Sequence, residues 1–280
     1  MKVYLINLDR REDRLAAVDQ QLQSLGMDYE RIPAVDGSLN DYRPPKIFNS
    51  FLYSINFKKR PVDTEVACAQ SHRCAWYAFL QSDSDCALIL EDDVVIDSSL
   101  VTFLSHKQLI RHFDVINISS KDPYYVPVDI VKKFSDDGVV VRPYVYQYLK
   151  RKQWHLMEWR RSWRIFKLHC YDNNIICECD PLPALASGYL LSRRAAESFY
   201  NTSKNLYYPI DLIWRYSGGL LVEGFVLQPL ITQKGNDSDI IGRSDQPEMP
   251  ALYKMLRPFL KSRRIKRKLD VLKLYGLFRH

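Results

Sequence analysis

A strand, a helix and a second strand follow one another at the start of the chain and set its class of fold. Residues 3–8 (VYLINL) form an apolar run of strand length, and residues 15–25 carry apolar side chains at helical spacing. Asp9, three residues before Glu12, predicts a capping box at the helix start, and Gly26 is placed to close it. Residues 29–32 predict the second strand. This succession predicts an α/β layer with parallel strand pairing.

The rest of the chain continues this alternation. Residues 64–80 predict a largely buried helix, and 192–200 predict another, whereas 38–62 contain three prolines and are expected to be irregular. Further strands are predicted at 87–90, 115–118, 139–141, 184–191 and 224–231.

Composition limits the class of protein. Of the 280 residues, 46% are hydrophobic and 26% charged, which is typical of a globular chain. No apolar run approaches the roughly 18 residues that a membrane-spanning helix needs. The start of the chain has no apolar stretch of signal-peptide length, so we expect a cytoplasmic protein with reduced cysteines.

The basic charge of the chain is local. The formal net charge is +7, but residues 257–280 contain nine Lys or Arg and one Asp, so the remainder is near neutral. A second zone, 142–167, mixes eight Lys or Arg with Tyr, Trp and Phe. Nucleic acid, an anionic membrane surface or a phosphorylated substrate would each attract such segments, and charge alone does not choose among them.

Three consecutive acids, Glu91, Asp92 and Asp93, follow directly on the apolar run 87–90. On an extended strand Glu91 and Asp93 project to one side and Asp92 to the other. Ligands of open α/β sheets bind beyond the carboxyl ends of the strands, where this triplet falls. Clustered carboxylates repel one another unless a cation neutralises them, and Mg²⁺ or Mn²⁺ suits such oxygen ligands. The alternative is an acidic turn that faces solvent.

Other polar residues stand in apolar or strand-end settings. Asp211 is either the N-cap of a helix over 212–216 or a general base. Gly188, after Ser187 in a predicted strand, permits close approach of a ligand to the backbone. Arg10, Arg11 and Arg14 follow the first strand, where they either meet a phosphate or base or form an exposed, salt-bridged helix face.

Six segments occur in the order found in one known family. They are VYLINLDRREDR (3–14), RIPAVDG (31–37), EVACAQSHRCAW (65–76), ALILEDDVVI (87–96), SGYLLSRRAAE (187–197) and PID (209–211). In these segments, which lie within 1–100 and 184–235, the chain resembles glycosyltransferase family 25. This is the lipopolysaccharide and lipooligosaccharide galactosyltransferase family, whose relatives include collagen galactosyltransferases.

The resemblance implies a GT-A-like, Rossmann-type sheet that binds a nucleotide sugar, with flanking helices. It implies transfer of a hexose, with inversion at the anomeric carbon, to a bacterial lipopolysaccharide core sugar. Galactose from UDP-galactose is the preferred expectation, and Mn²⁺ (or Mg²⁺) is the expected cofactor. UDP-glucose and UDP-N-acetylglucosamine remain alternative donors. A non-catalytic assembly protein and a nucleic-acid-binding protein are alternatives of a different class, and the ordered motifs argue against both.

The resemblance also implies roles for individual residues. Asp93 and Glu91 would bind the metal ion, with Glu91 or Asp92 supporting the ribose or a metal-bound water. Asp211 would be the catalytic base, with Asp92 as the second candidate. The expected donor-binding residues are Ile6, Asn7, Leu8, Arg10, Arg14, Gln70, Ser71, His72, Glu91, Asp92, Ser187 and Gly188.

The domain organisation and location follow from the same analysis. Residues 1–235 are expected to form the transferase domain, with 142–182 as an insertion on the acceptor or membrane side. Residues 236–280 are expected to form a linker and a basic amphipathic helix that holds the enzyme on the inner face of the cell membrane, near a lipid-linked oligosaccharide acceptor. The alternative for the tail is a helix packed on the core with a solvated basic face.

Overall fold

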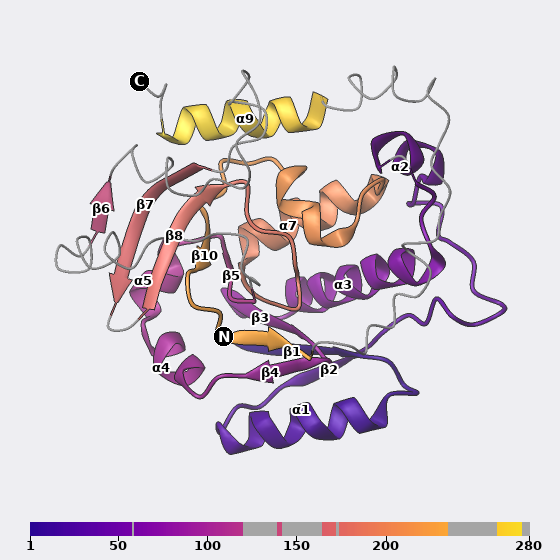
Figure 1. The fold of residues 1–280 in the computed structure, drawn as a ribbon, viewed down its shortest axis with the longest axis horizontal. Helices are drawn as coiled ribbons and strands as arrows, with labels where there is room; N and C mark the ends of the chain where they lie inside the picture. Colours follow the sequence, from indigo (N-terminus) through magenta and orange to yellow (C-terminus); the bar gives the residue numbers. More distant parts are fainter. Residues whose placement is uncertain (58, 120–138, 142–163, 172–173, 235–261, 276–280) are drawn as a thin grey trace.

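A mixed β-sheet forms the centre of the protein (Figure 1). The computed structural model describes residues 1–57, 59–119, 139–141, 164–171, 174–234 and 262–275. Within these residues the main sheet has the strand order β2-β1-β3-β9-β5-β10-β8-β7-β6. The strands are β1 (Lys2–Asn7), β2 (Glu30–Pro33), β3 (Cys86–Glu91), β5 (Val115–Asn117), β6 (Val139–Val141), β7 (Arg164–Tyr171), β8 (Asn174–Asp180), β9 (Gly188–Ser192) and β10 (Glu223–Val226).

The first three strands of the sheet are parallel. β1 pairs with β2 on one side and β3 on the other, which confirms the predicted strand–helix–strand opening. β5 and β10 also pair in parallel, whereas β9 runs antiparallel between β3 and β5. A separate two-stranded sheet pairs β4 (Val94–Ile96) with β11 (Ile231–Gln233). The predicted strand 224–231 is therefore two strands, β10 and β11, that belong to different sheets.

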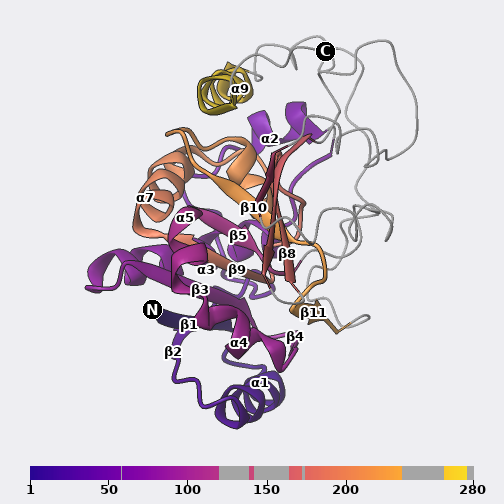
Figure 2. The same cartoon turned by 90° about the vertical axis from the view of Figure 1, so that its left-hand side faces the viewer.

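Helices cover both faces of the sheet (Figure 2). α1 (Glu12–Ser24), α4 (Ser99–Ser105) and α5 (Lys107–His112) pack on one face. α3 (Asp63–Gln81), α7 (Arg193–Thr202) and the 3-10 helix η4 (Ile210–Arg215) pack on the other. In β1, Val3 and Leu5 face the α1 side, while Tyr4 and Ile6 face the α3 side. This is why the strand has no polar residue between positions 3 and 6.

Two local predictions at the N-terminal helix differ in outcome. Gly26 has φ +64°, and the amide of Met27 donates to the carbonyl of Leu22, so the helix ends as predicted. The capping box is wrong, because Arg11 is the N-cap and makes no side-chain cap. Asp9 instead forms an ion pair with Arg31.

The segment 38–62, expected to be irregular, contains the helix α2 (Ser50–Phe57). Its apolar side chains reach the core: Tyr53 and Ile55 are each only 3% exposed. The hydroxyl of Tyr53 donates to Glu65 at the start of α3, 2.7 Å away. Tertiary packing thus stabilises this helix, which the sequence did not predict because prolines lie on both sides of it. A further 3-10 turn, η3 (Ser203–Asn205), follows α7.

The last described element is the helix α9 (Ser262–Tyr275), which carries part of the basic tail (Figure 1). Its Arg267 is 3% exposed and forms ion pairs with Glu223 of β10 at 2.9 Å and Asp180 of β8 at 3.1 Å. Tyr275 stacks on Phe166 of β7, with ring centroids 3.8 Å apart. One face of α9 is therefore packed on the core, as in the alternative given for the tail.

The buried acids beneath α9 depend on these contacts. Burial raises the pKa of Glu223 to about 8, although the charge of Arg267 beside it acts in the opposite direction. At Glu178, burial also acts to raise the pKa, but hydrogen bonds from His169, Tyr275 and His112 lower it to about 2. α9 thus supplies both a cation and a hydroxyl to acids that the sheet buries.

Several expectations concern residues outside the described part of the chain. The proposed boundary at 235–236 and most of the basic–aromatic zone 142–167 lie there. Within the expected insertion, residues 164–171 and 174–180 form β7 and β8 of the main sheet. No helix among the described residues is both long and apolar enough to cross a membrane.

We predict that Arg267→Ala lowers the free energy of unfolding by about 3–5 kcal/mol, because it removes the buried cation that pairs with the buried Glu223 and the partly buried Asp180. Urea denaturation would measure the change. The exposed neighbour Lys266→Ala is the matched control and should stay within about 0.5 kcal/mol of wild type. Equal stability of the two variants would show that α9 is not held by this ion pair.

Candidate functional site

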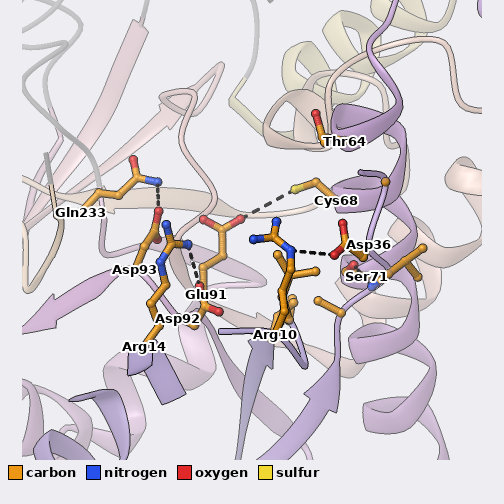
Figure 3. A pocket seen from close by; sticks show the side chains of 15 residues that line it. Arg10, Arg14, Asp36, Thr64, Cys68, Ser71, Glu91, Asp92, Asp93 and Gln233 are labelled. Atoms are coloured by element: carbon orange, nitrogen blue, oxygen red, sulfur yellow. Dashed lines mark hydrogen bonds and ion pairs between the residues drawn. The ribbon is translucent and has the colours of Figure 1, made fainter. Parts of the chain in front are cut away.

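A pocket opens at the carboxyl ends of β1, β2 and β3 (Figure 3). It is lined by Ile6 in β1 and Leu8 just after it, by residues 34–37 after β2, and by Glu91 at the end of β3 with Asp92 and Asp93 after it. α3 contributes a wall through Thr64, Cys68 and Ser71. The parallel pairing of the three strands brings their ends together, as the sequence predicts for the acid triplet.

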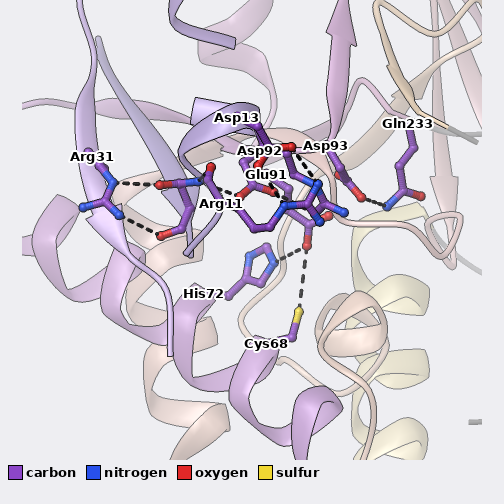
Figure 4. Close-up of polar contacts among 11 residues, drawn as sticks. Arg11, Asp13, Arg31, Cys68, His72, Glu91, Asp92, Asp93 and Gln233 are labelled. Atoms are coloured by element: carbon purple, nitrogen blue, oxygen red, sulfur yellow. Dashed lines mark hydrogen bonds and ion pairs between the residues drawn. The ribbon is translucent and has the colours of Figure 1, made fainter. Parts of the chain in front are cut away.

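The three acids are held by three different parts of the fold (Figure 4). β3 ends at Glu91, and Asp92 and Asp93 form a turn before β4. Asp92 is directed to β1 and α1: Asn7 Nδ2 donates to its Oδ2 at 2.8 Å, and Arg14 Nη1 donates to its Oδ1 at 3.2 Å. Both of its oxygens are thereby engaged, and the side chain is buried.

Glu91 is held from α3. His72 Nε2 lies 3.1 Å from Glu91 Oε1, and His72 Nδ1 lies 2.9 Å from the hydroxyl of Tyr189 in β9. Trp76 Nε1 donates to the same hydroxyl at 2.8 Å. Since Trp76 only donates, the Tyr189 hydroxyl is left to give its own hydrogen to Nδ1, and Nε2–H then donates to Glu91. A buried chain of hydrogen bonds therefore fixes the orientation of the Glu91 carboxylate.

Asp93 is held more weakly than its neighbours. Gln233 of β11 donates to its Oδ2 at 2.7 Å, and no hydrogen-bond partner among the described residues meets its buried Oδ1. Burial and the nearby charge of Glu91 raise the pKa of Asp93 to about 7. The pairing of β11 with β4 is what places Gln233 here. The negative charge of ionised Asp93 is thus not fully balanced by the cations among the described residues.

Basic side chains also line the pocket. Arg10 forms a 2.7 Å ion pair with Asp36, which follows β2, and Arg14 of α1 forms a 3.2 Å ion pair with Asp92. Gly37 packs against the start of α3, where a β-carbon would lie 2.5 Å from the carbonyl oxygen of Asp63. A larger residue there would push the loop after β2 away from the pocket.

The predicted donor-binding residues divide into two groups. Those that line the pocket are Ile6, Leu8, Arg10, Arg14, Ser71, Glu91 and Asp92. The other group does not line the pocket but contacts residues around it, and consists of Asn7, Gln70 and His72. Asn7 holds Asp92 and Arg31, Gln70 accepts a hydrogen bond from Tyr42 at 2.6 Å, and His72 holds Glu91.

Ser187 and Gly188 do not line the pocket. The expectation that Gly188 gives a ligand access to the backbone is not met, because the side chain of Ile231 occupies that space, 2.9 Å from a built β-carbon. The carbonyl of Ser187 accepts a hydrogen bond from the amide of Glu91 at 2.9 Å. These two residues thus fix the end of β3 from behind.

Asp211 lies in η4, half-buried, and is not part of the pocket wall. The helix begins at Ile210 with Pro209 as its N-cap, so the alternative role of Asp211 as an N-cap is wrong. Burial raises the pKa of the Cys68 thiol, and the charges of Glu91 and Asp211 raise it further.

Some pocket residues were not singled out from the sequence. Asp36 follows a predicted parallel strand, and its place after that strand was the available signal. Cys68 lies in the predicted helix and has its Sγ 3.8 Å from Glu91. Gln233 comes from a separate small sheet, 140 residues beyond Asp93, and no local pattern marks it.

The donor set fits a divalent cation. Asp93 has a buried oxygen with no hydrogen-bond partner among the described residues, its pKa is raised, and Glu91 is the charge that contributes most to that rise. A hard cation between the two carboxylates would remove their repulsion. Asp92, whose oxygens are taken by Asn7 and Arg14, is better suited to hold the site together.

Comparisons with known proteins agree on one family. Residues 1–214 match the family described as glycosyltransferase family 25 (LPS biosynthesis protein). The chain is similar to proteins named "Glycosyltransferase 25 family member", being 36% identical over 96 residues to that of Anopheles gambiae and 27% identical over 128 residues to that of Drosophila melanogaster.

These matches cover 33% and 43% of this chain, but only 16% and 21% of the two insect proteins. The chain therefore matches about a sixth to a fifth of their length. A further relative from Drosophila pseudoobscura pseudoobscura is 30% identical over 127 residues, which are 42% of this chain and 20% of that protein. The animal origin of these relatives argues against the expected bacterial assignment.

We predict that Asp93→Asn stabilises the metal-free protein more at pH 8 than at pH 5. The pKa of Asp93 is about 7 in the fold, against an ordinary 3.8, so the wild type loses stability as pH rises between those values. The gain at pH 8 is up to about 4 kcal/mol.

Urea denaturation in EDTA at both pH values measures this gain. The exposed Asp83→Asn is the matched control and should change stability equally at both. An Asp93→Asn effect that is the same at pH 5 and pH 8 would contradict the uncompensated carboxylate.

Proposed function

The chain belongs to glycosyltransferase family 25, and we propose that it transfers a hexose from a UDP-sugar to a sugar hydroxyl with inversion at the anomeric carbon. UDP-galactose is the leading donor, with UDP-glucose and UDP-N-acetylglucosamine as alternatives, and a lipopolysaccharide-type core sugar is the proposed acceptor. The observation that carries the proposal is a pocket at the ends of three parallel strands that is lined by the acid triplet and by two arginines.

We assign the nucleotide-sugar site to this pocket, in the manner of a GT-A fold. Ile6 and Leu8 offer apolar surface for the base, and Arg10 and Arg14 offer positive charge for a diphosphate. Arg10 already pairs with Asp36, so binding of a phosphate would compete with that partly exposed contact. The wall of α3 at Ser71 and Cys68 would then border the sugar.

The proposed metal ion, Mn²⁺ or Mg²⁺, would be held by Asp93 and Glu91. It would supply positive charge to neutralise the diphosphate as it leaves. Neighbouring residues orient these acids. His72 contacts Glu91, and Gln233 donates a hydrogen bond to Asp93. Asn7 and Arg14 each bind one oxygen of Asp92, so that this carboxylate is not available to the ion. No Ser-His-Asp arrangement is required, because direct inversion forms no covalent intermediate with the protein.

Inversion also needs a base for the acceptor hydroxyl. Asp211 remains the first candidate from the family resemblance, although it does not line the pocket. Asp92 is the second candidate, but Asn7 and Arg14 engage both of its oxygens, and an arginine ion pair keeps a carboxylate weakly basic. We therefore keep Asp211 as the first candidate.

The proposed lipid-linked acceptor and anionic membrane surface rest on the charge of the tail. Within α9 the inward face is taken up by Arg267, Asp270 and Val271. Lys266, Leu269 and Lys273 remain exposed and could meet a surface while the helix stays packed. Nucleic acid is not among the proposed partners.

We predict that Asp93→Ala removes nearly all sugar transfer, because the metal ion contributes several kcal/mol to stabilising the transition state. The measurement is UDP release from a panel of UDP-sugars with and without Mn²⁺. Asp83→Ala serves as the matched surface control. Full activity of Asp93→Ala, or of the wild type in excess EDTA, would exclude a metal-dependent triplet.

A second prediction separates the two candidate bases. Asp211→Asn should lower kcat by about 10²–10⁴-fold and spare UDP affinity, since loss of a general base acts on the chemical step. Asp92→Asn should instead disturb the contacts of Asn7 and Arg14 and weaken donor binding. Normal turnover in Asp211→Asn, or loss of UDP binding there, would move the role to another acid.

A further inference from the structure

A second group of possible metal ligands lies away from the pocket, where α5 meets the β7–β8 hairpin. It consists of His112 at the end of α5, His169 of β7 and Glu178 of β8. None of the three lines the pocket, and none belongs to a segment shared with the family motifs. Its residues are therefore not explained by the proposed transferase chemistry.

The fold brings these residues together from three elements. In the antiparallel β7–β8 pair, Lys167 is opposite Glu178, so His169, two residues along, is its diagonal neighbour on the same face. α5 ends above this face at His112. Phe113 packs edge-on against both His112 and His169, with ring centroids 4.9 Å away in each case.

The donor atoms converge on one point. His112 Nε2 lies 3.1 Å and His169 Nε2 lies 2.7 Å from the same oxygen, Glu178 Oε2. The two imidazole rings are 4.9 Å apart, and the ligand atoms of all three residues lie within 4.8 Å of one another. Ligands of a tetrahedral ion at bond lengths of about 2.0–2.2 Å are separated by similar distances.

The other oxygen of the carboxylate is held separately. Lys167 Nζ lies 3.6 Å from Glu178 Oε1, and the Tyr275 hydroxyl of α9 also hydrogen bonds to Glu178. Ligating carboxylates are commonly oriented in this way by outer contacts. Glu178 can therefore present Oε2 to an ion while its partners keep the side chain in place.

Exposure also suits an ion that enters from solvent. The side chains of His169 and Glu178 are 5% and 1% exposed, whereas that of His112 is 41% exposed. One side of the cluster thus opens to water, which would supply the remaining ligand and the entry path. Two imidazoles and one carboxylate favour Zn²⁺ or a related transition-metal ion over Mg²⁺ or Ca²⁺.

We propose that His112 Nε2, His169 Nε2 and Glu178 Oε2 bind one Zn²⁺-type ion, with water as the fourth ligand. The ion replaces the two hydrogen bonds to Oε2, and each imidazole binds as the neutral tautomer that carries its hydrogen on Nδ1. Bound there, it joins α5 to the β7–β8 hairpin and stabilises that part of the sheet. The site is independent of the acid triplet and of the proposed transfer reaction.

The test is titration of metal-free, tag-free full-length protein with Co²⁺ and then Zn²⁺, followed by visible absorption. We expect one equivalent of Co²⁺ with a tetrahedral spectrum, displaced by Zn²⁺, and a raised melting temperature with Zn²⁺. His112→Ala should weaken binding at least about tenfold and abolish the shift in melting temperature. The variant removes an exposed side chain, and circular dichroism checks that it is folded.

Two further variants make the result specific. His106→Ala, which removes the histidine that precedes α5, should bind as tightly as wild type. Asp93→Ala should also retain the Co²⁺ spectrum, which separates this site from the acid triplet. No tetrahedral spectrum, equal affinity in His112→Ala, or a sulfur-to-cobalt charge-transfer band would overturn the proposal. In those cases the three residues form a hydrogen-bonded network without a metal.

Discussion

Repulsion among three adjacent carboxylates at the end of β3 is the constraint around which the rest of the site is arranged. Separating them takes three different parts of the fold: β1 and α1 hold Asp92, α3 holds Glu91, and β11 holds Asp93. Of the three acids, Asp92 forms an ion pair with an arginine, Arg14. The remaining repulsion is concentrated between Glu91 and Asp93, where a cation is needed most.

The sequence predicts those parts of the fold in which local pattern and tertiary environment agree. The parallel β2-β1-β3 unit, α3 and the place of the acid triplet follow from apolar runs and strand ends. It fails where packing overrides the pattern, as in α2 among prolines and at the predicted capping box of α1. It also fails where one apolar run serves two sheets, as in β10 and β11.

The residues of the candidate site were likewise predicted only in part. Strand-end position identifies Glu91, Asp92, Asp93 and the arginines, because that edge of a parallel sheet is where ligands bind. It does not distinguish residues that face the pocket from those behind it. His72 and Asn7 have strand- or helix-face positions that suit a ligand contact, yet they act on Glu91 and Asp92. Gln233 depends on a long-range pairing that no local motif encodes.

The basic tail illustrates why net charge is a poor guide to function. Arg267, one of the cations that made the tail look like a membrane anchor, is among the most buried charges in the described chain. It compensates Glu223 and Asp180, so part of the positive charge serves acids that the sheet itself buries. A buried carboxylate destabilises the fold unless a cation or hydrogen-bond donor compensates its charge. The net charge of a sequence segment does not show whether its cations pair with buried acids or face an external partner. The outward residues of α9 are therefore the part of its charge from which a binding surface should be argued.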